Sequence, residues 1–188
     1  GDTTSWKGPT AIDVAMLGEV PPRGQPILRS GSKVGDAVYV TGKLGGSILG
    51  RHMTFEPRVQ LAQELAATGA VHAMIDISDG LAGDLGHICE ESRCGAILEK
   101  DLLEAVIHDD AHQLARQDGG DALDHALHDG EDFELAVVGN AKGLDPLVTK
   151  GQLLRIGVMT GEQGMRIRDG SAVNPMPAEG WQHRFGSE

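Results

Sequence analysis

A strand and a helix meet in the stretch Met74-Ile75-Asp76-Ile77-Ser78-Asp79-Gly80-Leu81. The apolar run from Ala73 to Ile77 predicts the strand, and Leu81, Leu85 and Ile88 follow at the spacing of one helix face. Residues two apart on a strand point the same way, so Asp76 and Ser78 are expected on one face. Two aspartates beside the positive end of a helix suit magnesium and phosphate, and the stretch therefore predicts a binding turn.

A purely structural role is the alternative for these residues. Ser or Asp between a strand and a helix is a routine N-cap, so Ser78 or Asp79 can cap the helix that follows. Residue type and spacing alone fit both interpretations.

The overall composition limits the classes of partner. The chain has 188 residues, of which 40% are apolar, which suits one domain with a proper core. A formal net charge of -12 argues against the positive surface that nucleic-acid and anionic-membrane binders need. The same charge repels phosphate esters, so a phosphate-handling role requires divalent cations as a bridge.

Neither export nor membrane insertion is expected. No apolar stretch reaches the roughly 18 residues of a membrane span, and the first residues lack a basic region and an apolar signal core. The two cysteines, Cys89 and Cys94, are too few for a disulfide framework and are expected to be reduced thiols. A cytoplasmic protein is therefore predicted.

Strand patterns alternate with helix patterns along the whole chain. This alternation predicts an α/β fold, an α+β mixed sheet with packed helices, without internal repeats. Helices are expected from Pro57 to about Gly69, from Leu81 to about Ser92, and as one or two short helices within Asp109 to Leu127. Strands are expected at Ala11–Val20, Ala37–Val40, Ala73–Ile77, Gly95–Glu99, from Gly130 through Val137, Leu153–Met159, and in a hairpin of 165–168 with 172–173.

Two further patterns have bland explanations. The glycine-rich stretch Gly42 to Gly50 lacks a Gly-Lys-Ser/Thr ending, so it is not a P-loop and is expected to be a mobile connection. The histidine pairs 108/112 and 125/128 have spacings that allow zinc, but no cysteine accompanies them. Solvated helix faces explain these pairs with fewer assumptions.

Three motifs in order carry a family resemblance: Gly1-Asp2-Thr3-Thr4, then Met74 to Leu81, then Gly130-Glu131-Asp132-Phe133-Glu134-Leu135. Together they resemble thiamine-monophosphate kinase, in the later part of that family's chains. The resemblance implies the C-terminal domain of the aminoimidazole ribonucleotide synthetase-like fold. Residues 1–24 would be a remnant of the N-terminal ATP-binding domain and 25–188 the C-terminal kinase domain, so that the fragment alone is expected to be inactive.

The activity that the resemblance implies is phosphorylation of thiamine monophosphate to thiamine diphosphate, with ATP and Mg²⁺. The attacking phosphate oxygen is already anionic near neutral pH, so no catalytic base is required and metal ions with positioning do the work. The family also implies a homodimer for the full-length protein.

The resemblance carries roles onto individual positions. The implied magnesium ligands are Asp2, Asp76 and Asp79; the implied nucleotide contacts are Gly1, Asp2, Arg29 and Ser78; and the implied substrate contacts are Glu131 and Trp181.

Two departures from the family pattern bear on the substrate. His128-Asp129 stand before Gly130 where small residues are usual, and Phe133 replaces a common tyrosine. The interpretation survives both changes, and two alternative functions also stay open. One is a related ATP-using synthetase with a purine intermediate or selenide as acceptor, and the other is a non-catalytic nucleotide-binding or assembly module.

Overall fold

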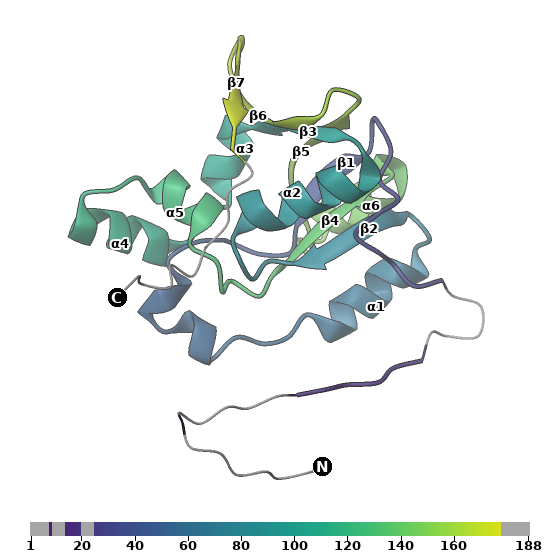
Figure 1. The fold of residues 1–188 in the computed structure, drawn as a ribbon, viewed down its shortest axis with the longest axis horizontal. Helices are drawn as coiled ribbons and strands as arrows, with labels where there is room; N and C mark the ends of the chain where they lie inside the picture. The colour runs from purple at the N-terminus through teal and green to yellow at the C-terminus, as the bar shows by residue number, and fades with distance from the viewer. Residues whose placement is uncertain (1–7, 9–13, 20–24, 178–188) are drawn as a thin grey trace.

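The centre of the molecule is a mixed β-sheet. The computed structural model describes residues 8, 14–19 and 25–177, and within them seven strands pair in the order β2-β4-β1-β5-β3-β6-β7 (Figure 1). All neighbouring pairs are antiparallel except β3 with β6. The strands are β1 (Ala37–Val40), β2 (Val71–Asp76), β3 (Gly95–Glu99), β4 (Leu135–Gly139), β5 (Leu154–Thr160), β6 (Gly164–Asp169) and β7 (Ala172–Met176).

Helices cover both faces of this sheet. One apolar cluster joins the sheet to α2, α3 and α5, and a second cluster joins the opposite face to α1 and α6. Figure 1 shows α2 lying across the sheet. The helices are α1 (Val59–Ala67), α2 (Leu81–Ser92), α3 (Lys100–Ala105), α4 (Asp109–Asp118), α5 (Ala122–His128) and α6 (Ala141–Thr149), with short 3-10 turns at η1 (Ser47–Leu49) and η2 (Arg51–Met53).

The central strand β1 shows why this sheet needs two helical layers. Val38 and Val40 point into the first cluster, whereas Ala37 and Tyr39 point into the second, and all four are fully buried. Because alternate residues of a strand face opposite sides, an uninterrupted apolar strand must be covered on both faces. The expected α/β architecture with a mixed sheet and packed helices is confirmed.

Most expected elements lie where the sequence pattern puts them. The strands at 37–40 and 95–99 and the helix at 81–92 have the expected bounds, and the hairpin of β6 and β7 turns at Gly170, where φ is 57°. Helix α1 begins at Val59, two residues after Pro57. Within the described ranges, no helix is long and apolar enough to cross a lipid bilayer.

Two expected strands are wrong in whole or in part. Residues 14–19 of the predicted strand Ala11–Val20 are extended and exposed but belong to no strand, because no neighbouring strand of the described chain pairs with them. The rest of that prediction lies outside the described residues. The strand expected to open at Gly130 begins only at Leu135, because Gly130, Glu131 and Phe133 have positive φ angles that no strand accommodates.

Candidate functional site

The turn between β2 and α2 brings the central acidic motif to the surface. Asp76 is the last residue of β2 and Leu81 is the first of α2, so only four residues separate strand from helix. Gly80 makes this possible with a φ of 100°, and a Cβ there would lie 2.8 Å from the carbonyl oxygen of Leu127. Asp76 and Asp79 are exposed, whereas Ile77 between them is fully buried.

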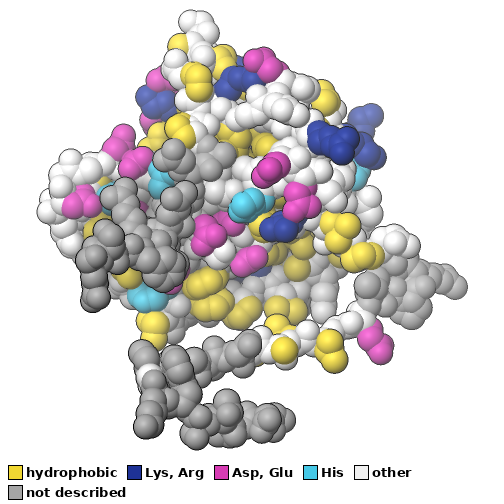
Figure 2. All heavy atoms as spheres, viewed as in Figure 1, with side chains coloured by type: hydrophobic (Ala, Val, Ile, Leu, Met, Phe, Trp, Pro, Cys, Tyr) yellow, Lys and Arg dark blue, Asp and Glu magenta, His cyan; other side chains and the backbone are white. Residues whose placement is uncertain are grey.

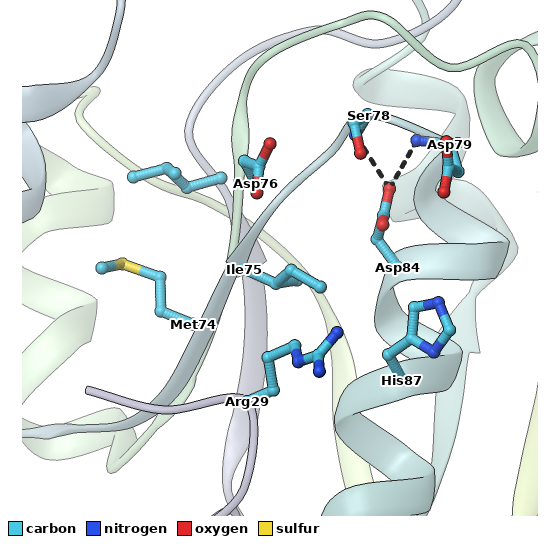
Figure 3. Close-up of a pocket in the computed structure, with 9 residues that line it drawn as sticks. Arg29, Met74, Ile75, Asp76, Ser78, Asp79, Asp84 and His87 are labelled. Carbon is cyan, nitrogen blue, oxygen red and sulfur yellow. Dashed lines mark hydrogen bonds between the residues drawn. The ribbon is translucent and has the colours of Figure 1, made fainter. Parts of the chain in front are cut away.

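The structural alternative for the turn, an N-cap, is not what the turn does. The N-cap residue of α2 is Gly80, and no side chain caps the helix. Instead Asp84, in the first turn of α2, accepts hydrogen bonds of 2.9 Å from the backbone N–H groups of both Ser78 and Asp79 (Figure 3). The side chains of Asp76 and Asp79 make no hydrogen bond or ion pair with the described residues, so they remain available to a ligand.

Asp84 lies outside the acidic motifs of the sequence, yet its side chain organises the turn. Its side chain is almost fully buried, and burial raises its pKa although the Ser78 and Asp79 N–H groups act in the opposite direction. The negative charges of Asp79 and Asp76 raise this pKa further. The carboxylates of Asp76, Asp79 and Asp84 therefore lie close enough for electrostatic repulsion between them.

A cavity of about 470 Å³ opens over this turn. Of the site residues expected from sequence, the structure brings four to its wall: Arg29, Asp76, Ser78 and Asp79. Figure 2 shows acidic side chains beside a histidine and a basic residue near the middle of this face. Asp84 and His87 of α2 also line the cavity, and sequence reasoning missed both, although their three-residue spacing on a helix that starts at the motif could have found them.

Arg29 reaches the cavity from the loop that precedes β1. Its guanidinium is held by Glu91 of α2 at 2.9 Å, and both side chains are about half exposed. Such a pair contributes little stability in water, so an arriving phosphate can compete for this arginine without a large cost.

The motif of residues 130–135 packs against the turn of residues 76–80. The loop of residues 130–134 exchanges backbone hydrogen bonds with Ile77 and Ser78, including one of 2.7 Å from the N–H of Glu131 to the carbonyl oxygen of Ser78. Gly130 approaches so closely that a Cβ would lie 2.5 Å from the same oxygen. Glu131 and Phe133 both have a φ of 53°, a left-handed conformation that costs energy for residues other than glycine. The contact between the two motifs compensates this local strain.

A second cavity, of about 340 Å³, adjoins the first at this contact. Ser78 and Asp79 line both cavities. The second cavity is also lined by the exposed carboxylate residue Glu131, by Asp129 and by the apolar side chains of Ile48 and Leu114. Glu131 therefore lies beside the turn, not in the cavity of Arg29.

The glycine-rich stretch Gly42 to Gly50 is not the mobile connection expected from its composition. Asp132 accepts hydrogen bonds of 3.0 Å from the N–H of Gly45 and forms an ion pair of 2.6 Å with Arg51. Gly45, Gly46 and Ser47 are buried in this contact. The glycines let the backbone approach α4 and α5 closely, since a Cβ at Gly45 would lie 2.6 Å from the backbone of Ala126.

The departures from the family pattern at Asp129 and Phe133 have structural explanations. Asp129 holds His125 at 2.9 Å and accepts a hydrogen bond from the N–H of Gly46. Burial of the ring lowers the pKa of His125, but the hydrogen bond and charge of Asp129 outweigh it, with help from Asp118, and the net pKa is raised. Phe133 packs against Phe55 with ring centroids 4.2 Å apart, so its aromatic face rather than a hydroxyl is used.

The remaining expected site residues and the zinc alternative can be placed briefly. Gly1, Asp2 and Trp181 lie outside the described residues. Among residues 25–177 and the shorter described segments, no three His, Cys, Asp or Glu side chains gather closely enough to hold a metal ion by themselves. The side chains of His108, His125 and His128 bond to their own helices or to neighbouring aspartates.

Magnesium nevertheless fits the turn. This ion demands oxygen ligands and usually binds through one or two protein carboxylates together with substrate phosphates and water. Asp76 and Asp79 supply two carboxylates on one cavity wall, and neither is paired within the part of the chain that the structure describes. A preformed cage of three protein ligands is not needed for that mode of binding.

Comparisons with known proteins agree on one group of relatives. No protein-family model matches the chain. Over 135 residues the chain is 50% identical to thiamine-monophosphate kinase of Rhodopirellula baltica, covering 72% of this chain and 41% of that protein. It is 36% identical to thiamine-monophosphate kinase of Salmonella typhimurium, covering 92% of this chain and 59% of the relative. The chain spans between 41% and 62% of the length of the curated relatives it matches.

Solved structures give the same result for the fold. Thiamine-monophosphate kinase of Stenotrophomonas maltophilia superposes with a TM-score of 0.64 at 29% identity, covering 80% of this chain and 55% of that one. A structure of AaThiL complexed with AMPPCP and TMP has the same TM-score at 24% identity, covering 84% and 54%. The hydrogenase maturation protein HypE of Escherichia coli reaches 0.66 at 17% identity, covering 85% and 53%, and shares the fold alone.

Proposed function

This chain is a relative of the thiamine-monophosphate kinases, and from that relationship we propose that the full-length protein transfers a phosphoryl group from ATP to thiamine monophosphate, giving thiamine diphosphate. The AaThiL structure supports the two substrates, because that neighbour was solved with AMPPCP and TMP. Magnesium is part of the proposal, since both substrates and the protein are anionic.

The observation that carries the proposal is that two cavities share one acidic turn. Ser78 and Asp79 line both the cavity of Arg29 and the cavity of Glu131. A donor bound in the first cavity and an acceptor bound in the second therefore have their phosphates close to the same side chains. Bringing two reactants together in this way can supply a large part of the rate enhancement for phosphoryl transfer.

The first cavity suits the donor. We propose that Arg29 and Ser78 contact the nucleotide phosphates and that Asp76 and Asp79 hold magnesium, joined by Asp2 and Gly1 from outside the described residues. Bound magnesium would neutralise charge on the phosphates. Asp84 keeps the Ser78 and Asp79 backbone in place through its two hydrogen bonds, so the turn need not reorganise during the reaction.

The second cavity suits the acceptor. Thiamine is an aromatic cation, and this cavity combines apolar walls at Ile48 and Leu114 with the carboxylate of Glu131. We propose that Glu131 attracts the cation and that Trp181, outside the described residues, supplies an aromatic contact. The terminal phosphate of thiamine monophosphate is already anionic near neutral pH, so no side chain has to remove a proton.

Proposals on domains, localisation, oligomeric state and partners accompany this one. Residues 1–24 are proposed to complete an N-terminal ATP-binding domain and residues 25–188 to form the C-terminal kinase domain. The full-length protein is proposed to be a cytoplasmic homodimer. It is also proposed to bind neither nucleic acid nor membranes, which the net charge of -12 on these 188 residues supports.

An acceptor panel tests the proposed function. The full-length protein is incubated with ATP and magnesium and with thiamine monophosphate, thiamine, a purine-biosynthetic intermediate or selenide in turn, and ATP consumption is measured. We expect the full-length protein to turn over only when thiamine monophosphate is the acceptor. We expect no turnover from the isolated 188-residue chain with any acceptor. Turnover with another acceptor would support the related synthetase instead, and AMPPCP binding without any turnover would support a non-catalytic module.

A further inference from the structure

One face of α2 borders the first cavity. Asp84 and His87, three residues apart, line the cavity, and Glu91, one turn further on, holds Arg29 at its wall. Residues at this spacing share a helix face. Two of the three have a clear task, since Asp84 fixes the acidic turn and Glu91 holds the arginine. His87, between them, has no such task.

His87 has no partner among the described residues, whereas most histidines of the described chain are engaged. His52, His72, His108, His125 and His128 each hydrogen-bond a carbonyl, a carboxylate or a backbone N–H group. The exposed ring of His87 makes no hydrogen bond or ion pair with any residue that the structure describes. Its side chain therefore presents a hydrogen-bond donor to the cavity rather than to the fold.

Carboxylates and nitrogen donors line different parts of the cavity. Figure 3 shows Asp76, Ser78, Asp79 and Asp84 at its upper end, with the Arg29 guanidinium and the His87 ring below them. Among the described residues that line the cavity, Arg29 is the only lysine or arginine. A chain of phosphates suits this division, because a metal-bound part can face the aspartates while the rest meets nitrogen donors.

From this placement we propose that His87 donates a hydrogen bond to a phosphate oxygen of the bound nucleotide, beside Arg29. The proposal rests on the proposed function, because it assigns the first cavity to the nucleotide. It adds a residue that acts on the phosphates and not on the nucleoside, and it gives α2 three successive functions along one face.

Binding measurements on the full-length protein test this role. The affinity for AMPPCP in the presence of magnesium is measured by calorimetry for the wild type, His87→Ala and His87→Gln. We expect His87→Ala to weaken AMPPCP about tenfold, equivalent to about 1.4 kcal/mol. His87→Gln keeps a side-chain N–H and should recover part of the loss. Adenosine, which has no phosphates, should bind all three proteins equally.

His112→Ala is the matched control. His112 is also exposed and without a partner among the described residues, but it lies on α4 and does not line the cavity. We expect its affinity for AMPPCP to equal that of the wild type. An unchanged affinity in His87→Ala, or an equal loss for adenosine, would overturn the proposal.

The same experiment separates this proposal from the proposed function. Wild-type turnover of thiamine monophosphate reports on the function, whereas the ratio of wild-type to His87→Ala affinity reports on His87 alone. A wild type that binds AMPPCP but phosphorylates another acceptor would refute the function and leave the role of His87 standing.

Discussion

Carboxylate side chains have opposite roles in the turn of residues 76–80 and in the loop of residues 129–134. In the turn of residues 76–80, Asp76 and Asp79 are exposed and make no hydrogen bond or ion pair with the described chain. In the loop of residues 129–134, three of the four carboxylates are already bound within the protein. Asp129 holds His125, Asp132 holds Gly45 and Arg51, and Glu134 holds Arg58 and Thr41.

The difference separates a motif that we propose binds ligands from a motif that holds the surrounding structure together. A buried carboxylate is costly unless charged or N–H partners compensate it, and Gly45, Arg51 and Arg58 supply such partners to the loop from distant parts of the sequence. The turn instead leaves its carboxylates in solvent, where a metal ion can reach them. Glu131 is the exception in the loop, because its side chain is exposed and lines the second cavity.

The largest expected effect is on catalysis, from the turn. In the full-length protein, Asp79→Asn and Asp76→Asn should each lower kcat by about 100-fold or more, because each removes a charge from the proposed metal site. Neither should change the free energy of unfolding by more than about 0.5 kcal/mol, since both side chains are exposed. Steady-state assays and urea denaturation measure the two quantities. Full kcat in both variants would show that the turn is not the ligand-binding motif.

The next effect is on stability, from the loop. Asp132→Ala should lower the free energy of unfolding by about 3 kcal/mol, because Arg51 and the buried N–H of Gly45 lose their partner. Asp79→Ala is the matched control, since it deletes the same atoms from an exposed position, and it should change stability by less than about 0.5 kcal/mol. Equal losses in urea denaturation would remove the distinction between the two motifs.

A smaller effect concerns pH. Burial raises the pKa of Asp132 to about 6, against the lowering effects of Gly45 and Arg51. Between about pH 4 and pH 6 the folded protein therefore holds a proton that the unfolded chain releases, and stability falls as pH rises through this window. The fall should be at most about 1.4 kcal/mol per pH unit within this window and should be missing from Asp132→Asn, which cannot titrate. An identical pH profile of unfolding for both proteins would assign the fall to other groups.

Much of the fold could be predicted because its signals are local. The alternating and continuous apolar runs of β1, β3 and the β6–β7 hairpin specify strands by themselves, and the apolar face of α2 specifies a helix. The stretch 14–19 shows where this reasoning ends. Its pattern is that of a strand, but a strand also needs a neighbour, and the described sheet offers it none.

The site was only half predictable for a related reason. Asp76, Ser78 and Asp79 are adjacent in sequence, so their motif indicated a binding turn. The role of Asp132 depends on Gly45 and Arg51, which lie more than 80 residues away, and composition made that glycine-rich segment look mobile. Whether a carboxylate is free or paired is decided by such distant contacts, and a single sequence does not show them.

The smallest effect tests whether carboxylate burial, rather than pairing alone, distinguishes the loop. Arg58→Ala should lower the free energy of unfolding by about 1 kcal/mol, because the Glu134 side chain that it leaves is only 11% exposed. Arg168→Ala is the control, since Arg168 is as exposed as Arg58 but its partner Glu99 is 32% exposed, and it should cost less than about 0.5 kcal/mol. If urea denaturation gives equal losses, the burial of the partner has no influence. Adding Glu134→Gln to Arg58→Ala should then restore stability only if an unpaired buried charge caused the loss.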